Sequence, residues 1–269
     1  TSEAFKNHQK HPTGYETINE YMERDFVVPK DFEDYAYVSQ LLQARGMKTA
    51  NESHRRAKPY CMGTLYWQFN DCWPVTSWSS LDYYGNWKAF HYQAKRSFEN
   101  LLFSVEEEND SYRIYIVNDD LKQYSGELVI DLIDFNGTKL WNKKIIFIAS
   151  ENSSKIHFEI PKKDFLAYNL KQAVLSVSFP PLEQIYTRHY FFKPKDLQIT
   201  KPNIQIKIIN EVTIEISSDV LAKDVFLSSE NDTFFEDNYF DLLSNEKRII
   251  KLSKPVQNIK VKSLFDTMK

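Results

Sequence analysis

The sequence predicts a mixed fold, in which a helix-rich part containing one buried strand is followed by two all-β sandwiches. Apolar residues recur at helical spacing through much of the first hundred residues. From about Phe103 the pattern changes to short apolar stretches separated by turn residues, which is typical of antiparallel sheets. The segment Lys193–Pro202 has the composition of a linker and divides this β part in two. The 269 residues are enough for about two or three domains.

Two helices are predicted before the strand. The first runs from about Glu16 to Arg24, after a turn that contains Pro12 and Gly14. Pro29 then interrupts the chain, and the second helix runs from Phe32 to about Arg56. Asp31 is a good N-cap for this second helix, with Asp34 three residues on, and Gly46 is a weak point inside it.

The stretch YCMGTLYWQF, Tyr60–Phe69, predicts a strand that is buried on both faces. It is short and mostly apolar, without strict alternation, as in strands of a parallel sheet. Another helix is predicted in GNWKAFHYQAKRSF, after a turn at Gly85. The order of helix, buried strand, long loop and helix indicates βα-type organisation.

The rest of the chain predicts short antiparallel strands. GELVIDLIDFNGTKLWNKKIIFIA holds two of them, joined at Asn136–Gly137, which is a strong hairpin signal. Other strands of the first sandwich are predicted in YRIYIVND, KIHFEIP, QAVLSVSF and QIYTRHYFF. After the linker, a second small sandwich is predicted from NIQIKIIN, VTIEISS, DVFLSS, KRIIKLS and NIKVKSL.

Composition excludes several classes of function. The net charge is −3 and the isoelectric point is near 6.1, so there is no global basic field for nucleic acid or an anionic membrane. No apolar run approaches the roughly 20 residues of a membrane span. Cys61 and Cys72 are predicted to be free thiols. His8 and His11 lack the carboxylate or cysteine partners of a metal site, and no cofactor motif is present.

Four of the five tryptophans lie in Thr64–Tyr92, the Trp-rich segment. They are either a packed structural corner or the floor of a ligand pocket. Indole rings suit the apolar C–H faces of a sugar, and amide and carboxylate groups suit its hydroxyls. WQFNDCW interleaves both kinds of side chain, so the candidate substrate-binding residues are Trp67, Asn70, Asp71 and Trp73.

Core packing is the favoured interpretation for the other two tryptophans of this segment, Trp78 and Trp87. For Asp71, hydrogen bonding to a sugar hydroxyl or to the loop itself is favoured over a catalytic role.

Three stretches resemble the end of the catalytic barrel and the following domains of the β-mannosidases of glycoside hydrolase family 2. They are HQKHPTG (residues 8–14), the long stretch Met62–Tyr92, and DNYFDLL (residues 237–243). The resemblance implies that residues 1–101 are the last strand and helices of a (β/α)8 barrel. Residues 102–195 and 196–269 are then two all-β, immunoglobulin-like sandwich domains.

The resemblance also implies a retaining exo-glycosidase that removes terminal β-linked mannose with two glutamates about 5–5.5 Å apart. In the family both glutamates lie on earlier barrel strands, upstream of His8. Residues Glu3, Glu16, Glu20 and Glu23 do not match the context of the nucleophile. No catalytic residue is therefore assigned to this chain, and the chain by itself is expected to be inactive.

By the same resemblance, Trp67 packs on the apolar face of the mannose that is cleaved. The rim of this subsite is shaped by Asn70, Asp71 and Trp73. Lys88 and His91 have structural roles. The implied partners are a β-mannoside or mannose-containing glycan and the upstream part of the same polypeptide. No cofactor, nucleic acid or membrane is implied, and the compartment would be periplasmic, secreted or lysosomal. The first hundred residues are expected to be unstable without the upstream barrel.

An alternative interpretation makes the two sandwiches a non-catalytic carbohydrate-binding or cell-surface interaction module. It requires a row of exposed aromatic side chains on one sandwich face. Trp141 is the only tryptophan in that part of the chain, and its place in a regular strand favours packing.

Overall fold

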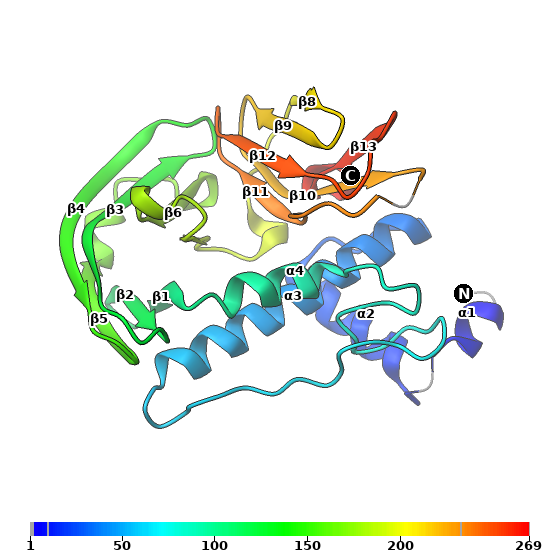
Figure 1. Cartoon of the computed structure of the whole chain (residues 1–269), viewed down its shortest axis with the longest axis horizontal. Coiled ribbons are helices and arrows are strands. Elements are labelled where there is room, and N and C mark those ends of the chain that lie inside the picture. The colour runs from blue at the N-terminus through cyan, green and yellow to red at the C-terminus, as the bar shows by residue number, and fades with distance from the viewer. Residues whose placement is uncertain (1–2, 10, 232, 269) are drawn as a thin grey trace. The chain divides into compact units, whose positions relative to one another are not determined.

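The computed structural model describes residues 3–9, 11–231 and 233–268, which form two compact units (Figure 1). The first unit consists of Thr1–Met47, Leu65–Ala94 and Ile199–Lys269. The second consists of Lys48–Thr64 and Lys95–Gln198. The first helices and the last sandwich therefore belong to one unit, although about a hundred residues of the other unit separate them in sequence.

The predicted helices are confirmed. They are α2 (Gly14–Asp25), α3 (Phe32–Arg56) and α4 (Ala89–Ser97), and a short helix α1 (Glu3–Asn7), which was not predicted, precedes them. The Asp31 carboxylate accepts a 2.9 Å hydrogen bond from the backbone N–H of Asp34, so Asp31 caps α3 as predicted. The helix continues without interruption through Gly46.

In the first unit, helix α2 and the first part of α3 share an apolar core. Met22 of α2 and Phe26, which directly follows α2, are buried with Val38 and Leu41 of α3, which lie on one face of that helix. The hydroxyl of Tyr37, also in α3, donates a 2.5 Å hydrogen bond to the carbonyl of Asp224. Through this bond α3 is attached to the C-terminal sandwich of the same unit.

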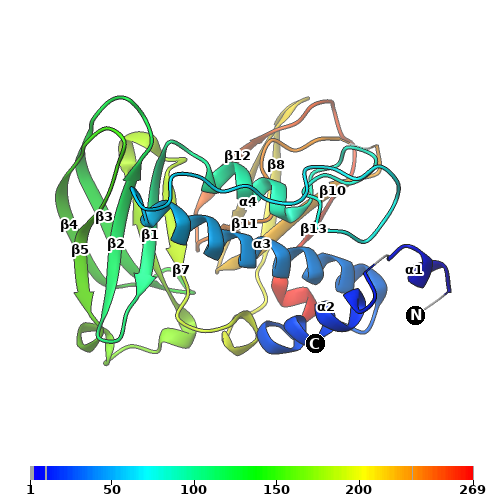
Figure 2. The same cartoon turned by 90° about the horizontal axis from the view of Figure 1, so that it is seen from below.

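The predicted buried strand Tyr60–Phe69 is wrong. The segment is an extended chain between α3 and α4 that forms no strand (Figure 2). The side chains expected in a core are exposed, namely Tyr60, Met62, Leu65, Trp67 and Phe69. A strand of a parallel sheet takes its hydrogen bonds from neighbouring strands, and none of the described residues forms a strand beside this one. The barrel part of the predicted fold is therefore not evident in this chain.

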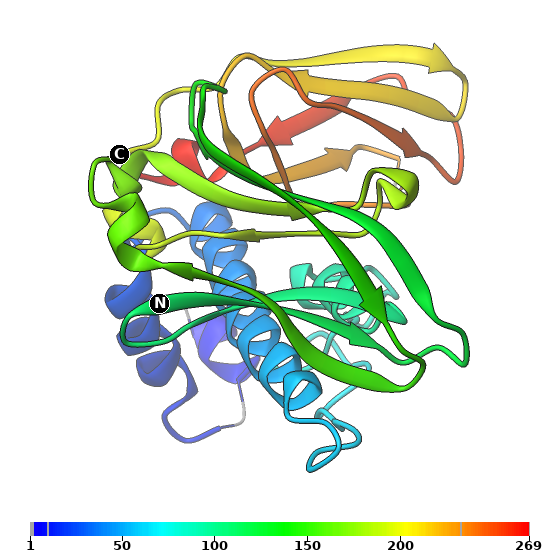
Figure 3. The ribbon, with the colours of Figure 1, turned by 90° about the vertical axis from the view of Figure 1, so that its left-hand side faces the viewer.

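The second unit contains the first sandwich, as predicted. One sheet has the order β1 (Leu101–Glu107), β2 (Ser111–Asn118), β5 (Ser153–Pro161), and the other has the order β4 (Lys139–Ala149), β3 (Tyr124–Asp134), β6 (Ala173–Ser178), β7 (Tyr186–His189). All neighbouring strands are antiparallel. The long strands β3 and β4 stand out in Figure 3.

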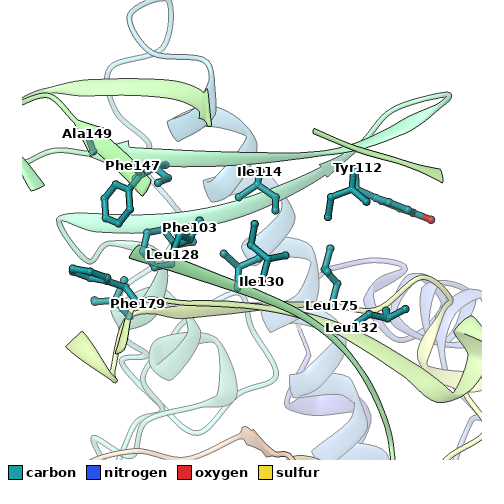
Figure 4. Packing of buried hydrophobic residues seen from close by; sticks show 14 of the residues in the cluster. Phe103, Tyr112, Ile114, Leu128, Ile130, Leu132, Phe147, Ala149, Leu175 and Phe179 are labelled. Atoms are coloured by element: carbon teal, nitrogen blue, oxygen red, sulfur yellow. The ribbon is translucent and has the colours of Figure 1, made fainter. Parts of the chain in front are cut away.

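The core of this sandwich is formed by alternate residues of the two sheets. Phe103 and Ile114 come from β1 and β2, and Leu128, Ile130 and Phe147 come from β3 and β4. All five are almost completely buried. Their side chains point into the space between the two sheets (Figure 4). The predicted alternation is thus confirmed for these strands.

The predicted hairpin joins β3 and β4. Gly137 has a φ of +95°, a conformation that glycine adopts without steric cost. The Asp134 carboxylate accepts hydrogen bonds from the backbone N–H groups of Asn136 and Thr138. This arrangement explains why Asp, Asn and Gly follow one another closely in the turn.

The C-terminal sandwich in the first unit is smaller. Its sheets have the orders β12 (Lys247–Lys251), β9 (Thr213–Ser218), β8 (Ile204–Asn210) and β11 (Phe240–Leu242), β10 (Ala222–Ser229), β13 (Ile259–Lys262). The buried side chain of Asn238 accepts from the Leu227 N–H and donates to the Leu227 carbonyl, both at 2.8 Å. The amide of Asn238 thus hydrogen-bonds β10 as the backbone of a partner strand would.

Cys61 and Cys72 are free, as predicted. Among the residues described, no helix has both the length and the apolar character needed to cross a membrane.

Candidate functional site

The Trp-rich segment is an irregular loop that ends in α4, and its tryptophans do not form one cluster. Trp67 is 77% exposed and Trp78 is 53% exposed, whereas Trp73 and Trp87 are partly buried. The favoured interpretation of Trp78 as a core residue is therefore wrong. Its backbone carbonyl, and not its ring, accepts the hydrogen bond from Gln43 of α3.

Trp67 is followed by a stretch that is firmly bonded to the later part of the loop. The Trp67–Gln68 peptide bond is cis. The carbonyls of Gln68 and Phe69 accept hydrogen bonds from the N–H groups of Ser80 and Leu81, at 3.1 and 2.9 Å. The side chain of Gln68 donates to the carbonyl of the exposed residue Asn70. Trp67 and Asn70 thus project from a short, well-connected stretch of backbone.

Asp71 lies below this surface and is 4% exposed. Its Oδ1 accepts from the Ser77 hydroxyl at 2.5 Å and from Gln68 Nε2 at 3.5 Å. Its Oδ2 accepts from the Ser79 hydroxyl at 2.5 Å and from Lys88 Nζ at 3.2 Å. The sequence analysis allowed Asp71 to bond either a sugar hydroxyl or the loop itself, and in the structure Asp71 bonds the loop.

Trp73 stacks on a histidine of the HQKHP motif. The ring centroids of His8 and Trp73 are 5.3 Å apart with an interplanar angle of 30°. His8 Nδ1 donates to the Pro74 carbonyl at 2.5 Å, and the His8 carbonyl accepts from the Thr76 N–H at 2.8 Å. His8 therefore holds the loop after Trp73, and no group of potential metal ligands occurs within the described ranges of the chain.

Trp87 belongs to an aromatic cluster at the start of α4. Its ring contacts His91 at 4.2 Å and Phe234 of the C-terminal sandwich at 4.9 Å. The predicted packing role of Trp87 is confirmed, but Trp87 contacts this sandwich and not a barrel. Burial in this cluster lowers the pKa of His91, whose Nδ1 lies 2.9 Å from the Ser80 hydroxyl.

A separate hollow of about 1130 Å³ lies between α1, α2, the start of α3 and residues 74–76. Its walls combine the acidic residues Glu16, Glu20 and Glu23 with the aromatic rings of Phe5 and Tyr15. None of the four predicted site residues lines it. The hollow therefore does not belong to the candidate sugar site.

Two protein-family models match the β part of the chain. Residues 110–196 match a mannosidase Ig/CBM-like domain, and residues 199–267 match an Ig-fold domain of mannosidases. A curated β-mannosidase from Mus musculus is 27% identical over 96% of this chain and 33% of its own length. One from Capra hircus is 38% identical over 43% of this chain and 15% of its own length.

The crystal structure of a β-D-mannosidase from Dictyoglomus thermophilum superposes on 96% of this chain with a TM-score of 0.86 and 28% identity. The chain matches a C-terminal portion of the β-mannosidases. It covers 33% of the length of the Mus musculus and Dictyoglomus thermophilum proteins. An exo-chitosanase from Amycolatopsis orientalis has a TM-score of 0.70 at 13% identity, which shows a shared fold only.

Sequence reasoning identified the exposed residues of the loop but missed the groups beneath them. Ser77 and Ser79 were not singled out, although they contact both oxygens of Asp71. A signal is visible in retrospect, because Ser77 and Ser79 alternate along the chain and can face the same side. Nothing in the sequence pattern showed that the two hydroxyls face Asp71.

Proposed function

We propose that this chain is part of a retaining exo-β-mannosidase that removes terminal β-linked mannose from oligosaccharides or glycoproteins. In this proposal the chain supplies one wall of the substrate pocket and the accessory sandwich domains. The two catalytic glutamates lie in the upstream part of a larger parent polypeptide. The substrate would be a β-mannoside or a mannose-containing glycan.

The observation that carries the proposal is the exposed ring of Trp67 beside the exposed amide of Asn70. Trp67 is 77% exposed, so its ring is accessible to a ligand. Its apolar face suits the C–H face of a sugar ring, and the Asn70 amide provides both a donor and an acceptor for hydroxyl groups. Covering of the ring by mannose would also exclude water from the oxocarbenium-like transition state.

Trp73 contributes to the same wall at its rim. It is partly buried, and its ring is held against His8, so it is a less accessible surface than Trp67. The acidic residues Glu16, Glu20 and Glu23 line the separate hollow and not the surface around Trp67. None of them is proposed as the acid, base or nucleophile.

The test is hydrolysis of an aryl β-mannoside by the larger parent polypeptide, with and without Trp67→Ala. We expect kcat/KM to fall by a factor of at least about 10 in the variant, because a sugar platform is lost. Trp78→Ala is the matched control, since it removes another exposed indole from the same segment and should change kcat/KM less than about twofold. Equal activities of the wild type and Trp67→Ala would refute a role of Trp67 in binding.

The location of the catalytic glutamates has its own test. The chain of residues 1–269 should show no turnover of the same aryl β-mannoside above the uncatalysed background. Turnover by this chain alone would contradict the proposal that both glutamates lie upstream.

The packing of Trp141 speaks against the alternative of a non-catalytic sugar-binding sandwich. Trp141 is partly buried and contacts Phe165 edge to face at 5.5 Å, as a packing residue does. A Trp141→Ala variant that stayed folded but lost binding to a glycan would support the alternative.

A further inference from the structure

We propose that Asp71 is a positioning residue, which holds in place the loop that presents Trp67 and Asn70 and does not itself bind the sugar. This inference rests on the proposed function, because it assigns a role within the same site. Of the four candidate residues, Asp71 then affects sugar binding only indirectly, through the position of the loop.

The carboxylate of Asp71 has no accepting capacity left for a ligand. Each oxygen already accepts two hydrogen bonds, from Ser77 and Gln68 on one side and from Ser79 and Lys88 on the other. The side chain of Asp71 is 2% exposed. A sugar hydroxyl would have to displace one of these donors and leave it unpaired in a buried place, which costs free energy.

The ion pair with Asp71 compensates an unfavourable position of the Lys88 charge at the start of α4. Lys88 comes directly before Ala89, the first residue of α4. A cation at the N-terminal end of a helix opposes the helix dipole, so Lys88 is unfavourable there unless another group compensates it. Asp71 is that group, and Lys88 Nζ also donates to the Ser79 hydroxyl at 2.6 Å.

The network reaches Trp67 through the next residue in the chain. Gln68 donates from the same Nε2 to Asp71 Oδ1 and to the carbonyl of Asn70. The Gln68 backbone is in turn held by the N–H of Ser80. Any movement of the Asp71 carboxylate therefore changes the position of Gln68, between the two residues proposed to contact the sugar.

The test is a double-mutant cycle on aryl β-mannoside hydrolysis by the larger parent polypeptide. Asp71→Asn should lower kcat/KM by a factor of about 10 or more, because displacement of a binding group by about 1 Å has effects of this size. In a Trp67→Phe background, Asp71→Asn should lower kcat/KM by less than about a third of the factor that it causes in the wild type. Both substitutions act through the position of the aromatic ring at residue 67, so their effects are not additive. Additive effects of the two changes would overturn the inference.

Lys88 provides a second arm with a matched control. Lys88→Met should lower kcat/KM as Asp71→Asn does, and Lys88→Arg should restore most of it, because the charge is kept. Lys262→Met is the control, since Lys262 also forms ion pairs in the first unit, but its partners Glu33 and Asp34, the latter at 2.6 Å, belong to α3 and not to the loop. It should leave kcat/KM unchanged. A loss of the same size in Lys262→Met would show general destabilisation and overturn the inference.

The outcomes separate this inference from the proposed function. If Trp67→Phe and Trp67→Ala both leave kcat/KM unchanged, the proposed sugar site fails. If they lower it while Asp71→Asn and Lys88→Met do not, only the positioning role fails. Should Asp71→Asn not fold, Ser77→Ala takes its place in the cycle, since it removes one of the four hydrogen bonds to Asp71 and no charge.

Discussion

The hydroxyl of Tyr92 in α4 donates a 3.0 Å hydrogen bond to the carbonyl of Phe235, which lies 143 residues further along the chain. The Tyr92 ring also stacks with Phe234 and contacts Tyr239. These contacts join two of the stretches that carry the family resemblance, Met62–Tyr92 and residues 237–243. The end of the Trp-rich segment is therefore anchored on the C-terminal sandwich of the same unit.

Tyr92→Phe should lower the free energy of unfolding by about 1–2 kcal/mol, because it leaves the Phe235 carbonyl without this donor in a buried place. Denaturant titration measures the change. Tyr84→Phe is the matched control, since Tyr84 is exposed and should give a change below about 0.5 kcal/mol. Equal effects of the two substitutions would contradict a stabilising role of the Tyr92 bond.

Gly46→Ala should stabilise the protein. Gly46 lies inside α3, and an added Cβ would meet no atom within 4 Å. Alanine is favoured over glycine in a helix by about 0.5–1 kcal/mol, mainly because the unfolded chain loses less freedom. The denaturation midpoint should therefore rise, and a fall in the midpoint would show that the backbone at Gly46 is not helical in solution.

The local elements were predictable because their signals lie within a few residues. Helix α3 begins and ends where the apolar spacing and the Asp31 cap place it. The turn between β3 and β4 follows from the pair Asn136–Gly137, since only a few residue types accept its backbone conformation. In both cases the interactions that decide the structure are made by neighbours in the sequence.

The features that the sequence did not reveal depend on partners that are distant along the chain. Tyr60–Phe69 has the composition of a strand, but a strand forms only where another strand offers hydrogen bonds. The packing of Trp87 on Phe234 could not be read from either stretch alone. At the candidate site, composition predicted the exposed residues Trp67 and Asn70, whereas the burial of Asp71 depends on how the loop folds back.

Gly126→Ala should destabilise the second unit. A Cβ on Gly126 in β3 would lie 2.6 Å from Cε2 of Phe179, whose ring is buried against Phe147. Because both rings are buried, the clash should cost about 1–3 kcal/mol as overpacking does, in addition to the backbone strain of alanine at the φ of +157° that Gly126 adopts. Thermal unfolding compares the variant with wild type, and Gly126→Ala together with Phe179→Leu should recover part of the loss. No recovery in the double variant would show that the clash with Phe179 is not the cause.

His91 should make stability depend on pH in the mildly acidic range. Burial against Trp87 lowers its pKa in the folded protein below the ordinary value of 6.5, so the unfolded chain takes up the proton first as the pH falls. The stabilisation is present above the unfolded pKa and is lost toward lower pH. Between about pH 7.5 and 5 the wild type should lose more free energy of unfolding than His91→Gln, which cannot titrate there. Parallel curves for the two proteins in denaturant titrations would contradict the lowered pKa.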